Sequence, residues 1–104
     1  MEIVLIDTFI VPEESRAEFR QAATGAQSFI RTLPGYVEGY IYEQMNGDSS
    51  SNFLTTAVWK TEDDFENAKK AVLAEYQRTG YDPQVTRRKL GIEQTRSTYT
   101  RAAY

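Results

Sequence analysis

The sequence predicts an α+β fold whose segments follow the order β-α-β-β-α-β. Three observations lead to this prediction. β-branched and aromatic residues gather in short runs, apolar residues recur at helical spacing in two longer stretches, and turn residues separate these segments. A split βαβ arrangement of this kind, the ferredoxin-like topology, forms a four-stranded antiparallel sheet with both helices on one face. We therefore expect residues 1–104 to form a single domain.

The first strand and the first helix occupy the opening third of the chain. Residues 2–11 are predicted as a strand whose two faces are both mostly apolar, which requires something packed on each side of the sheet. Ser15 and Glu18 fit a capping box at the start of a helix that ends in the Leu-Pro-Gly of residues 33–35. The apolar stripe of this helix comprises Phe19, Ala22, Ala23, Ala26, Phe29, Ile30 and Leu33.

A hairpin forms the middle of the chain. Residues 36–45 and 53–59 have the β-branched and aromatic composition of strands, and the Asn-Gly that opens the intervening loop is a strong turn signal. Thr61 then fits the cap of a second helix, and Asp64 can return the bond as in a capping box. This helix is expected to end near residues 79–80, where a glycine follows a threonine.

The last quarter of the chain has the weakest pattern. Residues 81–83 open a connection that we expect to be irregular, and the basic run at residues 87–89 is predicted to be a solvated loop. Residues 90–100 alternate weakly, which predicts an edge strand or a strand shared with another chain. Because two helices cover only one side of the sheet, the doubly apolar first strand predicts a homodimer formed by packing sheet on sheet.

The composition excludes several kinds of protein. A net charge of −3 argues against nucleic-acid binding. No apolar run is long enough for a membrane helix and no signal peptide is evident, so we expect a cytoplasmic protein. With no cysteine and no histidine, the chain lacks thiol nucleophiles and the commonest metal ligand and general base. Any chemistry must use other side chains or the substrate itself, and no metal, haem or flavin cofactor is expected.

Two residues are candidates for a site. Asp7 interrupts an apolar face of the first strand, where an ionised carboxylate is costly unless it is hydrogen-bonded or near water. It is either a strand-end acceptor for a backbone N–H or an acid in a cleft. Trp59 is the only tryptophan and lies where a strand turns into a helix, a common place for the mouth of a cleft. A lone aromatic residue is more often part of the core.

Two motifs carry a resemblance to a known family. They are Leu-Pro-Gly-Tyr at residues 33–36 and Ala-Val-Trp-Lys-Thr-Glu-Asp-Asp-Phe at residues 57–65. Through them, nearly the whole chain resembles the antibiotic biosynthesis monooxygenase family, whose members are dimeric α+β barrels. Residues 23–31 add a weaker likeness to members that oxidise anthrones and act on aromatic polyketides. The resemblance implies an oxygenase that works without a metal or an organic cofactor.

The resemblance can be carried over one residue at a time. The family tryptophan matches Trp59, and two asparagines of the polyketide oxygenases fall at Asp7 and Thr55. The haem-degrading members are not matched, because their second-helix histidine has no counterpart and Ala68 stands where they have a further tryptophan. The aromatic position that follows the tryptophan falls at Phe65, without the hydroxyl that some relatives carry. We assign substrate binding to Phe9, Phe29, Phe65 and Tyr76.

The implied reaction needs no histidine. An electron-rich phenol or anthrone that loses a proton can reduce oxygen directly when a protein excludes water, orients the ring and stabilises the developing negative charge. In this interpretation Asp7 takes the proton, Thr55 donates to the oxyanion and Trp59 stacks on the ring. Because a permanent carboxylate repels an oxyanion, Asp7 helps only as a base that becomes neutral during the reaction.

Two hypotheses of different classes follow. The first is a cofactor-independent monooxygenase acting on an aromatic polyketide, anthrone or quinol-like substrate. The second is a non-catalytic dimer that binds a small apolar molecule or stabilises a complex. An open cleft at Asp7, Thr55 and Trp59 with one polar end favours the first hypothesis, and a tightly packed Trp59 favours the second.

Overall fold

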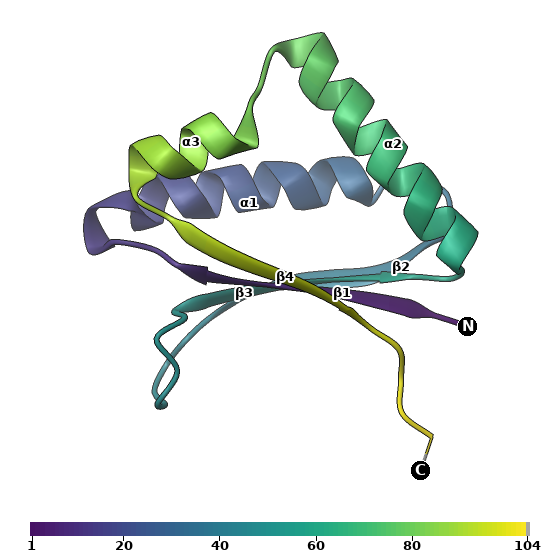
Figure 1. The fold of residues 1–104 in the computed structure, drawn as a ribbon, viewed down its shortest axis with the longest axis horizontal. Coiled ribbons are helices and arrows are strands. Elements are labelled where there is room, and N and C mark those ends of the chain that lie inside the picture. The colour runs from purple at the N-terminus through teal and green to yellow at the C-terminus, as the bar shows by residue number, and fades with distance from the viewer. Residues whose placement is uncertain (104) are drawn as a thin grey trace.

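The computed structural model describes residues 1–103, in which three helices cover one face of a four-stranded sheet (Figure 1). The strands are β1 (Ile3–Ile10), β2 (Tyr36–Glu43), β3 (Phe53–Trp59) and β4 (Glu93–Tyr99). The helices are α1 (Arg16–Ile30), which the 3-10 turn η1 (Glu13–Ser15) precedes, α2 (Glu62–Thr79) and α3 (Pro83–Leu90). Within residues 1–103, no helix has the length and apolar character needed to span a membrane.

The sheet has the predicted topology. Its strand order is β2-β3-β1-β4 and every neighbouring pair is antiparallel, which confirms the α+β, ferredoxin-like arrangement with β1 and β3 at the centre. Leu5 of β1 pairs with Ala57 of β3, and both pack against the first turns of α2. The odd-numbered residues of β1 and β3 therefore face the helices.

Two apolar clusters lie under the helices, one toward each end of the sheet. The first contains Ala57, Trp59, Phe65 and Ala68, with Ile3, Leu5, Ile30, Leu33 and Tyr36 packed against it. The second contains Val11, Phe19 and Phe53, with Phe9, Ala23 and Ile92 packed against it. Along β1, the first cluster takes Leu5 and the second takes Phe9, so Asp7 lies between the two cores.

The predicted cap at Thr61 forms in α2, where Asp64 bonds back to the Thr61 hydroxyl and not to a backbone N–H, and the capping box predicted for α1 does not form. Thr61 Oγ1 accepts a hydrogen bond from the Asp64 backbone N at 3.1 Å and donates to the Asp64 carboxylate at 2.9 Å. Ser15 occupies the cap position of α1 but makes no capping bond, so the capping box with Glu18 is wrong. The buried Ser15 hydroxyl instead donates to the Leu90 carbonyl at 2.8 Å and ties the end of α3 to the start of α1.

The buried face of α1 also differs from the predicted stripe. Ala22 and Ala26 are exposed, whereas Gln27 is buried and its amide donates to the Thr56 carbonyl at 3.1 Å. The helix is rotated relative to the predicted stripe, so that a glutamine takes a core position. A pattern of apolar residues cannot reveal such a position. Gly39 of β2 leaves room for it, because a side chain there would come within 2.8 Å of the Gln27 Oε1.

The connection after α2 is not irregular. Asp82 accepts a hydrogen bond from the Gln84 backbone N at 2.9 Å and caps α3, with Pro83 in the first turn. The basic run at residues 87–89 is the last turn of this helix and not a loop, since cations are favourable beside free helix carbonyls. Gly91 ends α3 with φ at 70°, so β4 begins later than predicted.

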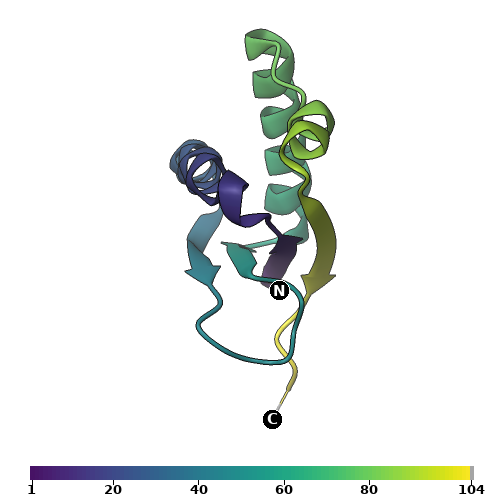
Figure 2. The ribbon, with the colours of Figure 1, turned by 90° about the vertical axis from the view of Figure 1, so that its left-hand side faces the viewer.

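Among the described residues 1–103, no helix covers the second face of the sheet (Figure 2). Figure 2 shows all three helices on one side, with the hairpin loop and the C-terminal segment extending on the other. Tyr40, Tyr42 and Tyr99 on this open face are each about half exposed, at 50%, 51% and 52%. Val4 and Ile6 of β1 point the same way and are only partly buried. The first strand is therefore apolar on both faces, as predicted.

Candidate functional site

The sheet register brings three polar residues into one row. Asp7 of β1 lies directly opposite Thr55 of β3 on one side and Arg96 of β4 on the other. Ile41 of β2, opposite Thr55, completes the row across the sheet. We call Thr55, Asp7 and Arg96 the polar row. It crosses the helix-facing side of the sheet between the two apolar clusters.

Asp7 and Arg96 form a two-point ion pair. Arg96 Nε donates to Asp7 Oδ1 at 2.8 Å, and Nη2 donates to Oδ2 at 3.0 Å. The Asp7 side chain is 8% exposed and that of Arg96 is 57% exposed. The hydrogen bond to Asp7 raises the pKa of Arg96 above its ordinary value, so the guanidinium stays charged. The partner of the carboxylate is thus a guanidinium and not the backbone N–H considered from the sequence.

Tyr76 of α2 packs against Tyr81 and interacts electrostatically with this pair. Burial is the largest cause that raises the pKa of its phenol above 10.0, and Tyr81, Arg96, Arg87 and Asp7 act on it electrostatically. At neutral pH the Tyr76 hydroxyl is protonated and can donate a hydrogen bond. Of the residues assigned to substrate binding, Tyr76 is the one whose phenol interacts electrostatically with Asp7 and Arg96.

Trp59 is buried in the first cluster. It is 2% exposed, and its ring meets that of Tyr36 edge-on at 5.6 Å between centroids. Ala57 separates it from Thr55 along β3, although both side chains face the helices. The structure therefore brings Asp7 and Thr55 together and leaves Trp59 tightly packed in the core.

The three phenylalanines assigned to substrate binding lie in different parts of the molecule. Phe65 is 9% exposed in the first cluster, with the Lys69 ammonium 4.9 Å from its ring centre. Phe9 packs edge-on against Phe19 in the second, with 4.7 Å between ring centroids. Phe29 is half-buried on α1. Both clusters place aromatic or aliphatic side chains on either side of the polar row.

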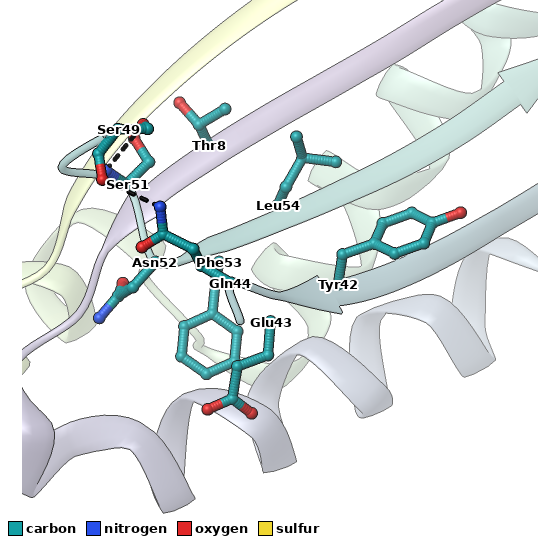
Figure 3. A pocket seen from close by; sticks show the side chains of 9 residues that line it. All are labelled: Thr8, Tyr42, Glu43, Gln44, Ser49, Ser51, Asn52, Phe53 and Leu54. Carbon is teal, nitrogen blue, oxygen red and sulfur yellow. Dashed lines mark hydrogen bonds between the residues drawn. The ribbon is translucent and has the colours of Figure 1, made fainter. Parts of the chain in front are cut away.

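Two shallow pockets lie elsewhere on the molecule. The first, of about 260 Å³, lies at the hairpin end of the open face (Figure 3) and is lined by Thr8, Tyr42, Glu43, Gln44, Ser49, Ser51, Asn52, Phe53 and Leu54. The second, of about 220 Å³, lies beside α1 and is lined by Arg20, Thr24, Ile41, Glu43 and Phe53. Neither pocket is lined by Asp7, Thr55 or Trp59. Within residues 1–103, no three carboxylates cluster to hold a metal ion.

Sequence reasoning missed Arg96. Its only signal was a charged residue on the inward face of the last strand, next to the neutral Gln94 and Thr98. That signal has no meaning until the register between β1 and β4 is known. The structure makes Arg96 the most exposed member of the polar row and the partner of Asp7.

The fold and the polar row define a small ferredoxin-like α+β domain in which Asp7 is a buried acid on the helix-facing side of the sheet. The model of the antibiotic biosynthesis monooxygenase family matches residues 2–78, and the chain belongs to that family. No curated protein matches the chain at the sequence level.

Solved structures share the fold at low identity. A mutant of SnoaB, a cofactor-independent oxygenase from Streptomyces nogalater, superposes with a TM-score of 0.71 and 21% identity over 99% of this chain and 95% of that one. A dabb family protein from Mesorhizobium loti gives 0.71 and 11% over 98% of both chains. A heme-degrading protein from Mycobacterium tuberculosis gives 0.59 and 16% over 66% of this chain and 78% of that one. At these identities the likeness shows the fold alone.

Proposed function

We propose that this protein is a cofactor-independent monooxygenase acting on an aromatic polyketide, anthrone or quinol-like substrate, with the polar row as its site. The observation that carries the proposal is the Asp7 carboxylate, which is buried beside Thr55 between two apolar clusters in a member of an oxygenase family. A buried charge is costly unless it is paired. Its place in the centre of the sheet fits a site for an aromatic molecule with polar edges.

The reaction balances without an added reductant. An anthrone loses a proton from its methylene carbon, and the carbanion adds oxygen to give a hydroperoxide. Loss of water from the hydroperoxide then leaves the quinone carbonyl, so one oxygen atom enters the product and the other leaves as water. The protein must hold the ring, accept a proton and stabilise the oxyanion.

The residues divide these tasks. Thr55 supplies a hydroxyl that can donate to the oxyanion. Asp7 remains the proposed base, and because both of its oxygens bond Arg96, that pair must open for Asp7 to receive a proton. Trp59 supports the site from within the first cluster, since a 2% exposed ring has no free face for a substrate.

A second function has a specific observation in its favour. Trp59 is tightly packed and Asp7 is already paired, which suits a non-catalytic dimer that binds a small apolar molecule or stabilises a complex. Under this alternative, the Asp7–Arg96 pair is purely structural. The two functions differ in whether the protein converts a substrate at the polar row.

The family resemblance and the open sheet face also lead us to propose a homodimer. The half-exposed tyrosines and the apolar residues of β1 on this face would be covered if two sheets packed together. A permanent interface of this kind commonly buries about 2,000 Å² or more. Because β4 lies at the sheet edge, we propose that the segment over residues 90–104, of which residue 104 lies outside the described residues, contributes to the partner.

Oxygen uptake tests the proposed activity. The wild-type protein, freed of metal by a chelator, is incubated with a panel of anthrones and hydroquinones while dissolved oxygen is followed. Asp7→Asn should lower turnover by about 10²–10⁴-fold if Asp7 is the base. Thr55→Val, which has nearly the same shape without the hydroxyl, should lower turnover without weakening the fold.

The melting temperature of each sample separates catalysis from stability. An Asp7→Asn protein that is less stable but keeps its turnover per folded molecule would show that Asp7 is structural. Trp59→Phe should chiefly reduce stability because it leaves space in the first cluster. Absence of oxygen uptake with every substrate would favour the non-catalytic function.

A further inference from the structure

The Asp7–Arg96 pair is buried on one side only. Its carboxylate is 8% exposed, whereas its guanidinium is 57% exposed. The pair uses Nε and Nη2 of Arg96, which leaves Nη1 and one further N–H of Nη2 for another acceptor. Within residues 1–103, Arg96 makes no other hydrogen bond or ion pair. Asp7 therefore fixes the position of the guanidinium, while Nη1 and one N–H of Nη2 remain available to another acceptor.

Arg96 keeps its positive charge at this place. Its side-chain hydrogen bond to Asp7 raises the pKa of the guanidinium above its ordinary value. The remaining N–H groups of Arg96 are therefore cationic donors, which bind an anionic oxygen more strongly than a neutral one.

Apolar side chains flank this group of donors. Leu5 packs against the first cluster, is only partly buried, and lies next to the polar row on one side. Phe9 packs against the second cluster, is only partly buried, and lies next to it on the other side. A ligand that suits both features combines a flat apolar body with an anionic oxygen at one edge.

We propose that Arg96 contacts the substrate and binds its anionic group, so that the substrate class is an aromatic anion carrying a carboxylate or an ionised phenol or enol oxygen. The inference rests on the proposed function for the location of the site, but it concerns binding and not turnover. While the ion pair is closed, the positive charge of Arg96 offsets the repulsion that an anionic oxygen would meet beside Asp7. Asp7 fixes the plane of the guanidinium through two hydrogen bonds.

Two probes of nearly equal shape test the proposal. Naphthalene-2-carboxylate carries the charge, and naphthalene-2-carboxamide lacks it. Calorimetric titration of the wild-type protein should give a dissociation constant about tenfold or more lower for the carboxylate, as expected for a charge-assisted hydrogen bond. Arg96→Gln should bring the two constants within about threefold of each other. Arg96→Lys keeps the charge without the planar fork and should retain part of the preference.

Arg20→Gln is the matched control. Arg20 also forms a two-point ion pair, with Glu43, so this variant removes the same charge from another part of the molecule. It should keep the full preference for the carboxylate. Circular dichroism of each variant confirms that the protein titrated is folded, and Arg96→Lys provides a second folded test if Arg96→Gln unfolds.

Several results would overturn the proposal. They are equal binding of both probes by the wild-type protein, no binding of either at millimolar concentration, an undiminished preference in Arg96→Gln, or an equal loss in Arg20→Gln. A carboxylate preference that depends on Arg96 supports the proposal even when no substrate consumes oxygen. In that event the proposed activity fails and the anion site stands, so the two failures can be told apart.

Discussion

Removing Arg96 should destabilise the protein more than removing a similar arginine whose partner is exposed. Arg96→Gln leaves the Asp7 carboxylate, 8% exposed, without its cationic partner. A buried group left unsatisfied costs about 1–3 kcal/mol. The larger cost of about 3–5 kcal/mol applies to fully buried pairs, and here water can reach the space that Arg96 vacates. We therefore expect a loss of about 1–3 kcal/mol in the free energy of unfolding.

Arg20 provides the comparison. It makes the same kind of two-point contact with Glu43, at 2.8 Å to each oxygen, but both side chains are exposed, at 49% and 40%. Exposed pairs contribute about 0.2–1 kcal/mol, so Arg20→Gln should cost no more than that. Urea unfolding of both variants and the wild-type protein, at one protein concentration, measures the difference.

The melting temperature should follow the same order. One kcal/mol shifts it by roughly 4–8 °C in a domain of this size. Arg96→Gln should melt several degrees below Arg20→Gln. If Arg20→Gln lost as much stability as Arg96→Gln, burial of the carboxylate would not decide the cost, and the reasoning about the polar row would be refuted.

Four further outcomes follow from the structure. Ile6→Glu on the open face, or deletion of the chain after Gly91, should yield a monomer in sedimentation equilibrium, and a dimer that survived both would contradict sheet-on-sheet packing. Burial raises the pKa of Tyr76, so the contribution of Tyr76 to the free energy of unfolding is complete below pH 10.0 and is lost as the pH rises through the raised pKa. Tyr76→Phe should flatten this decline in stability when unfolding by urea is measured across that pH range. Gly39→Ala should cost about 1–3 kcal/mol because the new Cβ would lie 2.6 Å from a backbone oxygen, whereas Gly25→Ala, with open space around it, should stabilise α1 by about 0.5–1 kcal/mol. Activity should persist in chelator, and a stoichiometric metal lost together with activity would contradict a cofactor-free reaction.

Local signals predicted most of the fold. The strand over residues 53–59 and the cap at Thr61 depend on neighbouring residues only, and both appear as expected. The signals of α3 were also present in Asp82, Pro83 and Gly91. Each of these residues also favours turns, and the short basic run between them has no apolar period, so the sequence alone predicts a loop there.

The candidate site could be predicted only in part. Asp7 was noticed because a charge on an apolar face is costly, which one sequence can reveal. Its partner Arg96 is 89 residues away, and only the pairing of β1 with β4 brings them together. Ser15 illustrates the same limit, since its hydroxyl bonds a carbonyl 75 residues away in place of the local cap.

The distance along the chain between Asp7 and Arg96 has a consequence for folding. β1 can pair with β3 as soon as residues 53–59 have been synthesised, but its other edge stays bare until β4 follows. A bare apolar edge invites pairing with a second unfinished chain, and an inward charge on that edge opposes it. A foreign strand that docked there would have to bury the Asp7 carboxylate without a cation. β4 is the strand that brings Arg96 to that position and pairs the Asp7 carboxylate.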